Sequence, residues 1–168
     1  MAESLCHTAM NKFKAKYGII PNVSDHEFFT NSIHTPVWET VDPFKKIDTE
    51  CQLTGYSNAG CITYVEIGES CANNEQAIEN LVDYAYEHDI PYFAINLPND
   101  MCEVCGYQGE IKENEPCPCC GEINNISRLR RVTGYLTQDF TKSTNKGKIA
   151  EIRSRVKHTD YMKIPLGE

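Results

Sequence analysis

The sequence predicts an α/β fold in which two parallel strands are joined by a helix, with a cysteine-rich segment after them. Residues 61–67 are rich in β-branched and aromatic side chains and are bounded by glycines, which predicts a strand. Residues 91–97 form a second, almost uninterrupted apolar strand. Between them, residues 74–89 place their apolar side chains on one face of a helix. Such a βαβ unit has a right-handed crossover and buries both faces of its strands.

The residues before this unit are predicted to contain helices. Residues 2–17 repeat apolar side chains every four positions and are followed by a glycine, as expected for an amphipathic helix with a glycine stop. Ser24 and Glu27 have the spacing of a capping box, which predicts a short helical turn. Asp42 and Pro43 predict the start of another helix, because Asp is a good N-cap and proline suits the first helical position.

The residues after the cysteine-rich segment are predicted to form an extended stretch, a turn and a last helix. The extended stretch covers residues 128–133, and Gly134 marks the turn. The helix runs from residue 145 to 158. Its apolar side is formed by Ile149, Ile152 and Val156.

The whole-chain composition favours one compact unit with an appendage. The chain has 168 residues, of which 40% are hydrophobic. No run approaches the roughly 20 apolar residues of a membrane span, and the polar first residues do not resemble a signal peptide. We therefore expect no membrane association and a cytoplasmic location.

The net charge of −8 is unevenly distributed. Residues 1–120 hold 6 basic and 19 acidic side chains, whereas residues 121–168 hold 10 basic and 5 acidic ones. The basic tail is interpreted either as a solvated helix face that pairs with the acidic body or as a surface for phosphates or a partner.

Two pairs of cysteines predict a metal site. Nine cysteines, an odd number, with two tight C-x-x-C pairs favour metal binding in a reducing compartment over a disulfide framework. Each pair is followed by a glycine, and an eleven-residue loop separates the two turns. Four thiolates can surround a tetrahedral Zn²⁺ and leave no open position, so the metal is expected to be structural. The predicted ligands are Cys102, Cys105, Cys117 and Cys120.

Two alternatives to this ligand set and role are open. Cys119 could replace a neighbouring ligand, but C-x-x-C spacing at both ends favours leaving it unligated. The knuckle could also be a nucleic-acid-binding zinc ribbon that uses the basic tail. Only Tyr107 is available there for base stacking, and the acidic side chains of the loop would repel phosphate, so nucleic acid is an unlikely partner.

The segment Arg130-Arg131-Val132-Thr133-Gly134-Tyr135-Leu136, followed by Asn145-Lys146-Gly147-Lys148, closely resembles the C-terminal signature of anaerobic (class III) ribonucleoside-triphosphate reductases. By pattern alone, Gly134 is a turn or bulge residue. The resemblance covers essentially the whole chain, because further segments occur in the family's order. These are Gly18–Val23, Asn31–Val37, Asn58–Glu66, Tyr92–Asn96 and the four-cysteine knuckle.

The resemblance implies that Gly134 is the site of a stored glycyl radical and that the four cysteines hold zinc. In the family, a separate activase with S-adenosylmethionine and an iron–sulfur cluster generates the radical. The radical passes to a cysteine inside an α/β barrel, and the thiyl radical starts the reduction of ribonucleoside triphosphates. Glycine suits this role because a planar Cα radical shares its electron with both flanking peptide groups, and a side chain would crowd it.

The resemblance also implies three regions and a missing remainder. Residues 1–98 would be the C-terminal segment of the glycyl-radical-enzyme barrel, 99–124 the zinc knuckle, and 125–168 the glycyl-radical loop with its C-terminal helix. Family enzymes are several times longer, so a larger polypeptide with the rest of the barrel and the thiyl cysteine is an expected partner. The chain is then a split-gene product, an excised fragment, or a stand-alone replaceable radical subunit.

Residues outside the motif receive weaker interpretations. The family commonly has histidine where this chain has Cys61, and a buried free thiol there would behave as a small hydrophobe. Arg128, Arg130 and Arg131 could anchor the radical loop to acidic residues or contact the activase, with surface ion pairing as the simpler expectation. His158 would lie at the negative C-terminal end of the last helix.

Overall fold

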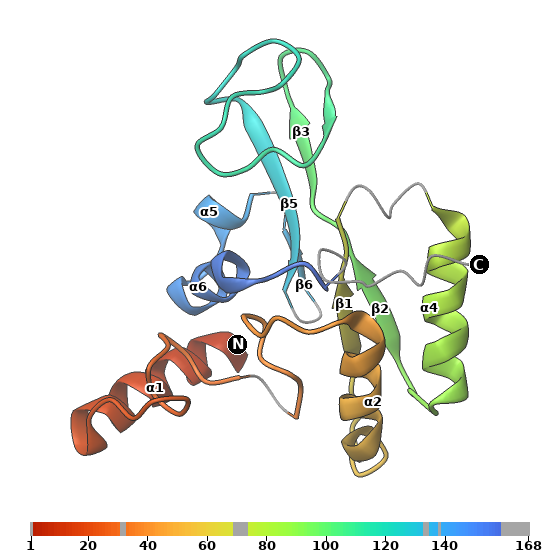
Figure 1. Ribbon diagram of the computed structural model, residues 1–168. Coiled ribbons are helices and arrows are strands. Elements are labelled where there is room, and N and C mark those ends of the chain that lie inside the picture. Colours follow the sequence, from red (N-terminus) through yellow and green to blue (C-terminus); the bar gives the residue numbers. More distant parts are fainter. Residues whose placement is uncertain (1, 31–32, 69–73, 133–134, 138, 159–168) are drawn as a thin grey trace. The chain divides into compact units, whose positions relative to one another are not determined.

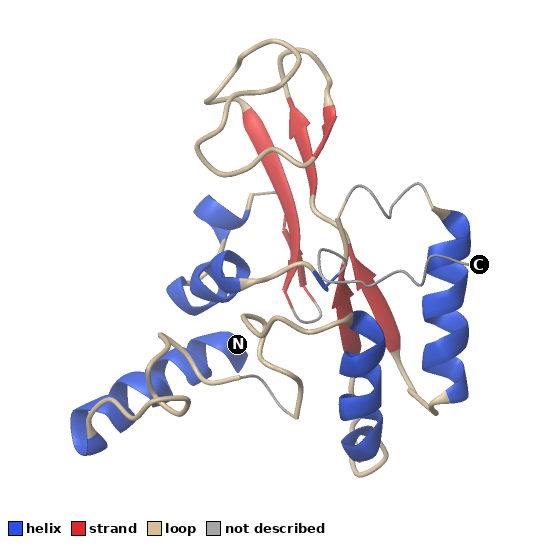
Figure 2. Ribbon diagram, in the orientation of Figure 1, coloured by secondary structure: helices blue, strands red, loops and turns tan. Residues whose placement is uncertain are grey.

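A computed structural model describes residues 2–30, 33–68, 74–132, 135–137 and 139–158 (Figures 1 and 2). Internal contacts divide the chain into two units, each assembled from two stretches of sequence. The knuckle unit consists of Met1–Phe29 and Pro98–Arg153, and the α/β unit consists of Thr30–Leu97 and Ser154–Glu168. Among the described residues, no helix combines the length and the apolarity needed to cross a membrane.

The α/β unit contains the predicted strand–helix–strand arrangement. Strand β1 (Thr63–Glu66), helix α4 (Glu75–Glu87) and strand β2 (Phe93–Asn96) follow one another, and the two strands pair in parallel from Thr63↔Phe93 to Glu66↔Asn96. Both strands are shorter than the apolar runs that predicted them. Helix α2 (Pro43–Thr54) lies beside this pair and also contacts α4 (Figure 1).

Apolar side chains from both strands and α4 form the core of the α/β unit. Val65, Ile67 and Leu81 are almost fully buried. Partly buried side chains pack around them, namely Phe44, Phe93 and Ile95. The helix start predicted at Asp42 is confirmed, because the Asp42 carboxylate accepts the backbone N–H of Phe44 at 2.9 Å and Pro43 takes the first helical position.

The knuckle unit is built around a small antiparallel sheet with strand order β4-β3-β5-β6. Its elements are α1 (Ala2–Tyr17), β3 (Asn99–Cys102), β4 (Gln108–Gly109), β5 (Ile126–Val132), β6 (Tyr135–Thr137), α5 (Phe140–Ser143) and α6 (Lys146–Ser154). The predicted first helix is confirmed, and Gly18 ends it at a φ of 78° with its N–H on the carbonyl of Lys14. The predicted extended stretch forms most of β5, whereas β3, β4, β6 and α5 were not predicted.

The helical turn predicted at Ser24 is wrong, since residues 21–28 form turns and bends. The Ser24 hydroxyl accepts the N–H of Ile20 at 2.8 Å and donates to the carbonyl of Gly18 at 3.0 Å. Ser24 therefore closes the loop that precedes it and does not cap a helix after it.

The last helix is also shorter than predicted, because α6 ends at Ser154. The backbone N–H of Val156, which the prediction placed inside the helix, donates to the carbonyl of Val37 at 3.0 Å. This bond to a distant segment replaces the bond that a continuing helix would need. His158 consequently does not lie at a helix end and is buried in the α/β unit instead.

Candidate functional site

The four cysteines predicted as ligands come together in the knuckle unit. Cys102 ends β3, and the other three lie in the turns and loops that follow. Their Sγ atoms all lie within 4.8 Å of one another, and the Cys102–Cys120 and Cys105–Cys117 pairs are 3.6 Å apart. A tetrahedral zinc with sulfur at about 2.3 Å places its ligands about 3.8 Å apart. The cluster therefore has the chemistry and the size that a zinc ion needs.

The two C-x-x-C-G turns have matching geometry, which explains the repeated glycine. The N–H of Gly106 donates to the carbonyl of Cys102, and the N–H of Gly121 donates to the carbonyl of Cys117, both at 2.9 Å. The glycines have φ values of 76° and 78°, a backbone region that side chains disfavour. Each glycine thus lets the chain turn back under its pair of sulfurs.

The buried cluster of the knuckle is small, and half of its residues are cysteines. Cys102, Cys117, Ile111 and Ile126 form one buried cluster, and Tyr107 packs against it. Cys119 is exposed and does not belong to the four-cysteine group. Since Tyr107 is partly buried against this core, it does not present a free ring for base stacking.

Polar contacts favour ionised sulfur at Cys117, whereas hydrogen bonds to the neighbouring thiols raise the pKa of Cys120. Burial opposes ionisation of Cys117, but hydrogen bonds to the backbone of Cys120 and Cys119 and to neighbouring thiols lower its pKa to about 7. A thiol must lose its proton to bind a metal. Cys117 is thus partly prepared as a ligand by its backbone surroundings.

The predicted radical segment lies on an antiparallel hairpin. Strands β5 and β6 pair through Arg130↔Thr137, Arg131↔Leu136 and Val132↔Tyr135. Thr133 and Gly134 connect the two strands in sequence and lie outside the described residues. Of the Arg131↔Leu136 pair in the described strands, Leu136 has an exposed side chain.

Arg130 is held in the interior of the unit and not in a surface ion pair. Its guanidinium donates to both carboxylate oxygens of Asp100, with Nη2 to Oδ2 at 3.0 Å. Asp100 has no exposed surface, and the Arg130 side chain is only 13% exposed. The anchoring role predicted for the arginines is therefore assigned to Arg130, and Asp100 is a partner that the sequence analysis missed.

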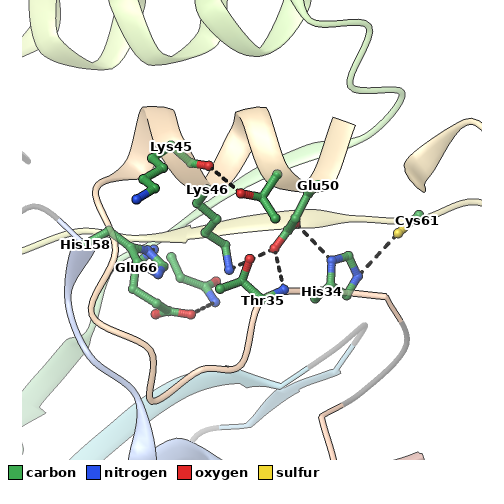
Figure 3. Close-up of polar contacts among 10 residues, drawn as sticks. His34, Thr35, Lys45, Lys46, Glu50, Cys61, Glu66 and His158 are labelled. Atoms are coloured by element: carbon green, nitrogen blue, oxygen red, sulfur yellow. Dashed lines mark hydrogen bonds and ion pairs between the residues drawn. The ribbon is translucent and has the colours of Figure 1, made fainter. Parts of the chain in front are cut away.

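A second buried polar group, also missed, lies in the α/β unit (Figure 3). The carboxylate of Glu50 in α2 has three polar contacts. One oxygen pairs with Lys46 Nζ at 3.0 Å and accepts the backbone N–H of Thr35 at 2.9 Å. The other oxygen lies 3.0 Å from His34 Nδ1. Burial alone would raise the pKa of Glu50, but the His34 hydrogen bond and the Lys46 charge outweigh it and bring the pKa to about 2. The i,i+4 spacing of Lys46 and Glu50 was the available sequence signal.

Cys61 closes this group at the other side of His34, as Figure 3 shows. Its Sγ lies 3.4 Å from His34 Nε2. Burial, followed by the negative charge of Glu50, raises the pKa of Cys61 above its ordinary value. The thiol therefore stays protonated at neutral pH and donates to His34, which fits a buried structural thiol better than a nucleophile.

His158 fills the α/β unit beside this group. Its Nδ1 accepts the backbone N–H of Glu66 at 2.9 Å, so the proton of the neutral ring resides on Nε2. Within the described residues, Nε2 is buried without a hydrogen-bond partner. Burial, followed by the nearby charge of Lys46, lowers the pKa of His158 to about 3.

Comparison with known proteins gives consistent matches. The family model "Anaerobic ribonucleoside-triphosphate reductase" matches residues 2–158. The chain is 37% identical over 162 residues to the anaerobic ribonucleoside-triphosphate reductase of Escherichia coli (strain K12), covering 94% of this chain and 22% of that protein. It is equally similar to the enzyme of that name from Enterobacteria phage T4, of which it covers 26%. The chain thus spans about a quarter or less of these relatives.

Solved structures support the same fold. A structure described as anaerobic ribonucleotide reductase superposes with a TM-score of 0.70 at 23% identity, over 93% of this chain and 23% of that one. The anaerobic ribonucleotide reductase of Thermotoga maritima, solved with MES in its active site, gives 0.61 at 25% identity over 81% of this chain and 21% of its own. Because the family model matches nearly the whole chain, the protein belongs to the anaerobic ribonucleoside-triphosphate reductase family.

Proposed function

We propose that this chain is the C-terminal glycyl-radical region of an anaerobic ribonucleoside-triphosphate reductase and that Gly134 stores the radical. The observation that supports it best is the family match through residue 158, which includes the Arg130–Leu136 segment. The adjoining four-cysteine cluster supports it independently, since its sulfurs have the spacing of a zinc site.

Gly134 would act through one hydrogen atom. A 5′-deoxyadenosyl radical, made by an activase with S-adenosylmethionine and an iron–sulfur cluster, removes a Cα hydrogen and leaves as 5′-deoxyadenosine. The Gly134 radical later takes a hydrogen atom from a cysteine thiol, which restores glycine and forms a thiyl radical. That thiyl radical abstracts the ribose 3′ hydrogen of a ribonucleoside triphosphate, and the 2′ hydroxyl takes up a proton and leaves as water. Two reducing equivalents from an external reductant, formate or a thiol protein, then complete the deoxyribonucleotide.

Cys102, Cys105, Cys117 and Cys120 would hold a structural zinc. With four thiolates the ion has no open position, so it supplies folding free energy and takes no part in the chemistry. The knuckle needs this contribution because, among the described residues, its buried hydrophobic cluster has two isoleucines besides two cysteines, with Tyr107 packed against it. Cys119 remains outside the proposed ligand set.

The proposed activity requires more chain than this one. The thiyl cysteine, the rest of the α/β barrel and the nucleotide-binding regions would belong to a larger polypeptide, which together with the activase is a proposed partner. Within the same proposal, residues 1–98 complete the barrel, 99–124 form the knuckle, and 125–168 form the radical loop and final helix. A cytoplasmic location would fit this function.

Replacing Gly134 with alanine tests the radical assignment. We expect the anaerobic wild-type chain, with activase, S-adenosylmethionine and its larger partner, to give a doublet electron paramagnetic resonance signal, and Gly134→Ala to give none. Zinc content should be equal in both. Air should cut the activated wild-type backbone at residue 134, which mass spectrometry would locate. An intact backbone and no unpaired spin in the activated wild type would refute the proposal.

The same variant separates this function from nucleic-acid binding. A zinc-ribbon module would bind nucleic acid equally well with Gly134→Ala, because the knuckle and the basic tail are unchanged. The partly buried position of Tyr107 and the acidic loop residues Glu110, Glu113 and Glu115 disfavour that alternative.

A further inference from the structure

Three hydrogen bonds converge on the carboxylate of Asp100 in the middle of the knuckle unit. Two come from the guanidinium of Arg130 in β5, as described above. The third comes from the backbone N–H of Ile111, which donates to Oδ2 at 2.8 Å. Asp100 has no exposed surface, so these donors take the place of water around its charge. One carboxylate thus joins two segments that lie far apart in the sequence.

Ile111 links the four-cysteine cluster to the Asp100 carboxylate. It lies in the loop between the two C-x-x-C-G turns, and its side chain is buried against Cys102 and Cys117. Because both neighbours belong to the four-cysteine cluster, a change in that cluster moves the packing around Ile111. Its N–H then moves relative to Asp100.

Arg130 links the Asp100 carboxylate to the β5–β6 hairpin. It pairs with Thr137 across β5 and β6, two residues before the Val132↔Tyr135 pair. Its guanidinium also lies over the ring of Phe140, 5.6 Å from the centroid, and Phe140 begins α5 just beyond β6. The Arg130 guanidinium, which belongs to β5, therefore also contacts the residue that begins α5 just after β6.

We propose that the Asp100–Arg130 pair transmits the order of the knuckle loop to the β5–β6 hairpin, which makes Arg130 a positioning residue for the segment that carries Gly134. The link to Gly134 rests on the function proposed above, whereas the coupling of loop and hairpin stands on the described contacts alone. Arg130 touches no reacting atom and acts through the strand that it holds. An arginine is needed at this position because its planar guanidinium can donate to both carboxylate oxygens of Asp100 at once.

Hydrogen exchange on the full chain tests the coupling. In the wild type, removing zinc with a chelator should raise the exchange of the β5 and β6 amides about tenfold. Asp100→Asn keeps the size of the side chain and an oxygen for the Ile111 N–H but loses the charge that holds Arg130. We expect this variant to retain zinc. Its hairpin amides should exchange about tenfold faster than those of the zinc-loaded wild type, whether or not the variant holds the metal.

Arg130→Lys and Glu113→Gln complete the set. Lysine keeps the charge but cannot bind both oxygens, so Arg130→Lys should also retain zinc and loosen the hairpin. Glu113→Gln is the matched control, because Glu113 lies in the same loop and pairs with exposed Arg153 at 2.9 Å. Its hairpin should exchange as in the wild type.

Two results would overturn the coupling. One is a hairpin as protected in both zinc-loaded Asp100 and Arg130 variants as in the wild type. The other is loss of zinc in Arg130→Lys together with a loosened hairpin. In that case the Asp100–Arg130 pair would be needed to fold the knuckle itself and would not couple the loop to the hairpin.

Electron paramagnetic resonance tests the positioning role. With activase and the larger partner, zinc-loaded Arg130→Lys should give at least about tenfold less radical per chain than the wild type, and Glu113→Gln a normal yield. A normal yield and doublet splitting from Arg130→Lys would remove the positioning role. Absence of a radical in the wild type would instead refute the proposed function, and the exchange result would stand apart from it.

Discussion

Half of the residues in the buried cluster around the four cysteines are themselves cysteines, whereas the buried cluster of the α/β unit is entirely apolar. Cys102 and Cys117 share the first cluster with two isoleucines. Val65, Ile67 and Leu81 form the second, with aromatic and aliphatic side chains around them. Apolar burial contributes about 25 cal/mol per Å², so a small, sulfur-rich interior has little to contribute without a metal.

The two units also use buried charge differently. In the knuckle unit, Asp100 and Arg130 connect a loop to a hairpin. In the α/β unit, Glu50 gathers donors from α2 and from the segment around His34. If the proposed zinc is bound, the knuckle unit depends on a metal and the α/β unit on packing, so each should fail under a different perturbation.

Loss of a zinc ligand should have the largest effect and should stay local. Structural zinc supplies an apparent binding free energy on the order of 10–16 kcal/mol at neutral pH. Cys105→Ser should therefore abolish zinc binding and expose the amides of β3 and β4 to rapid exchange, while β1, β2 and α4 stay protected. Metal analysis and hydrogen exchange measure both.

Cys119→Ser is the control for that experiment, since Cys119 is exposed and outside the four-cysteine group. It should retain zinc. The comparison between the units would break if the two serine variants bound equal amounts of zinc, or if metal loss unfolded the α/β unit as well.

A cavity in the apolar core should destabilise the α/β unit and leave zinc in place. Leu81 is only 1% exposed, so Leu81→Ala should lower the free energy of unfolding by about 2–5 kcal/mol, measured by urea denaturation. Val82, its neighbour on α4, is 46% exposed, and Val82→Ala should cost less than about 0.5 kcal/mol. Equal losses from the two variants would contradict the assigned core.

Acid should weaken the α/β unit through His158. Its pKa falls from 6.5 to about 3 on folding. Between these two pH values the unfolded chain therefore binds a proton at His158 that the folded chain does not bind. Stability is therefore lost as the pH falls below 6.5. At pH 5 the loss relative to pH 7 should be about 2 kcal/mol.

Urea denaturation at both pH values measures this loss in the wild type and in His158→Gln. The variant removes the titrating group, so its loss between pH 7 and 5 should be smaller by about 2 kcal/mol. Half-exposed His26 gives the matched control, His26→Gln, which should retain the wild-type pH dependence. An unchanged pH dependence in His158→Gln would contradict the buried neutral ring.

The smallest effect is expected at the start of α2. Asp42→Ala removes the acceptor of the Phe44 N–H and should cost about 1 kcal/mol of unfolding free energy. Asp42→Ser retains a capping oxygen and should cost less. If serine and alanine were equivalent in urea denaturation, the helix would not depend on this cap.

The sequence predicted features that depend on neighbouring residues. Apolar periodicity located α1, α4 and the two parallel strands, and the Asp42-Pro43 pair located the start of α2. The C-x-x-C-G repeat predicted the four-cysteine cluster, because ligand spacing within each turn is local. Family resemblance, and no local pattern, singled out Gly134.

The remaining features depend on contacts between distant residues. Asp100 and Arg130 are thirty positions apart, and nothing near either one indicates the other. The Glu50 group was missed because its partner His34 is 16 positions away and because charged side chains are rarely fully buried. The last helix was extended too far because its apolar spacing continues to Val156, although that residue's N–H bonds to Val37.

The order in which the chain visits its two units has a consequence for synthesis on the ribosome. The α/β unit is made of residues 30–97 and residues from 154 onward, so its second stretch is translated only after the knuckle unit is complete. His158 and Val156 form their bonds to Glu66 and Val37 in that late step. When translation has just passed α6, all residues of the knuckle unit have therefore been made, whereas the α/β unit still lacks its closing segment.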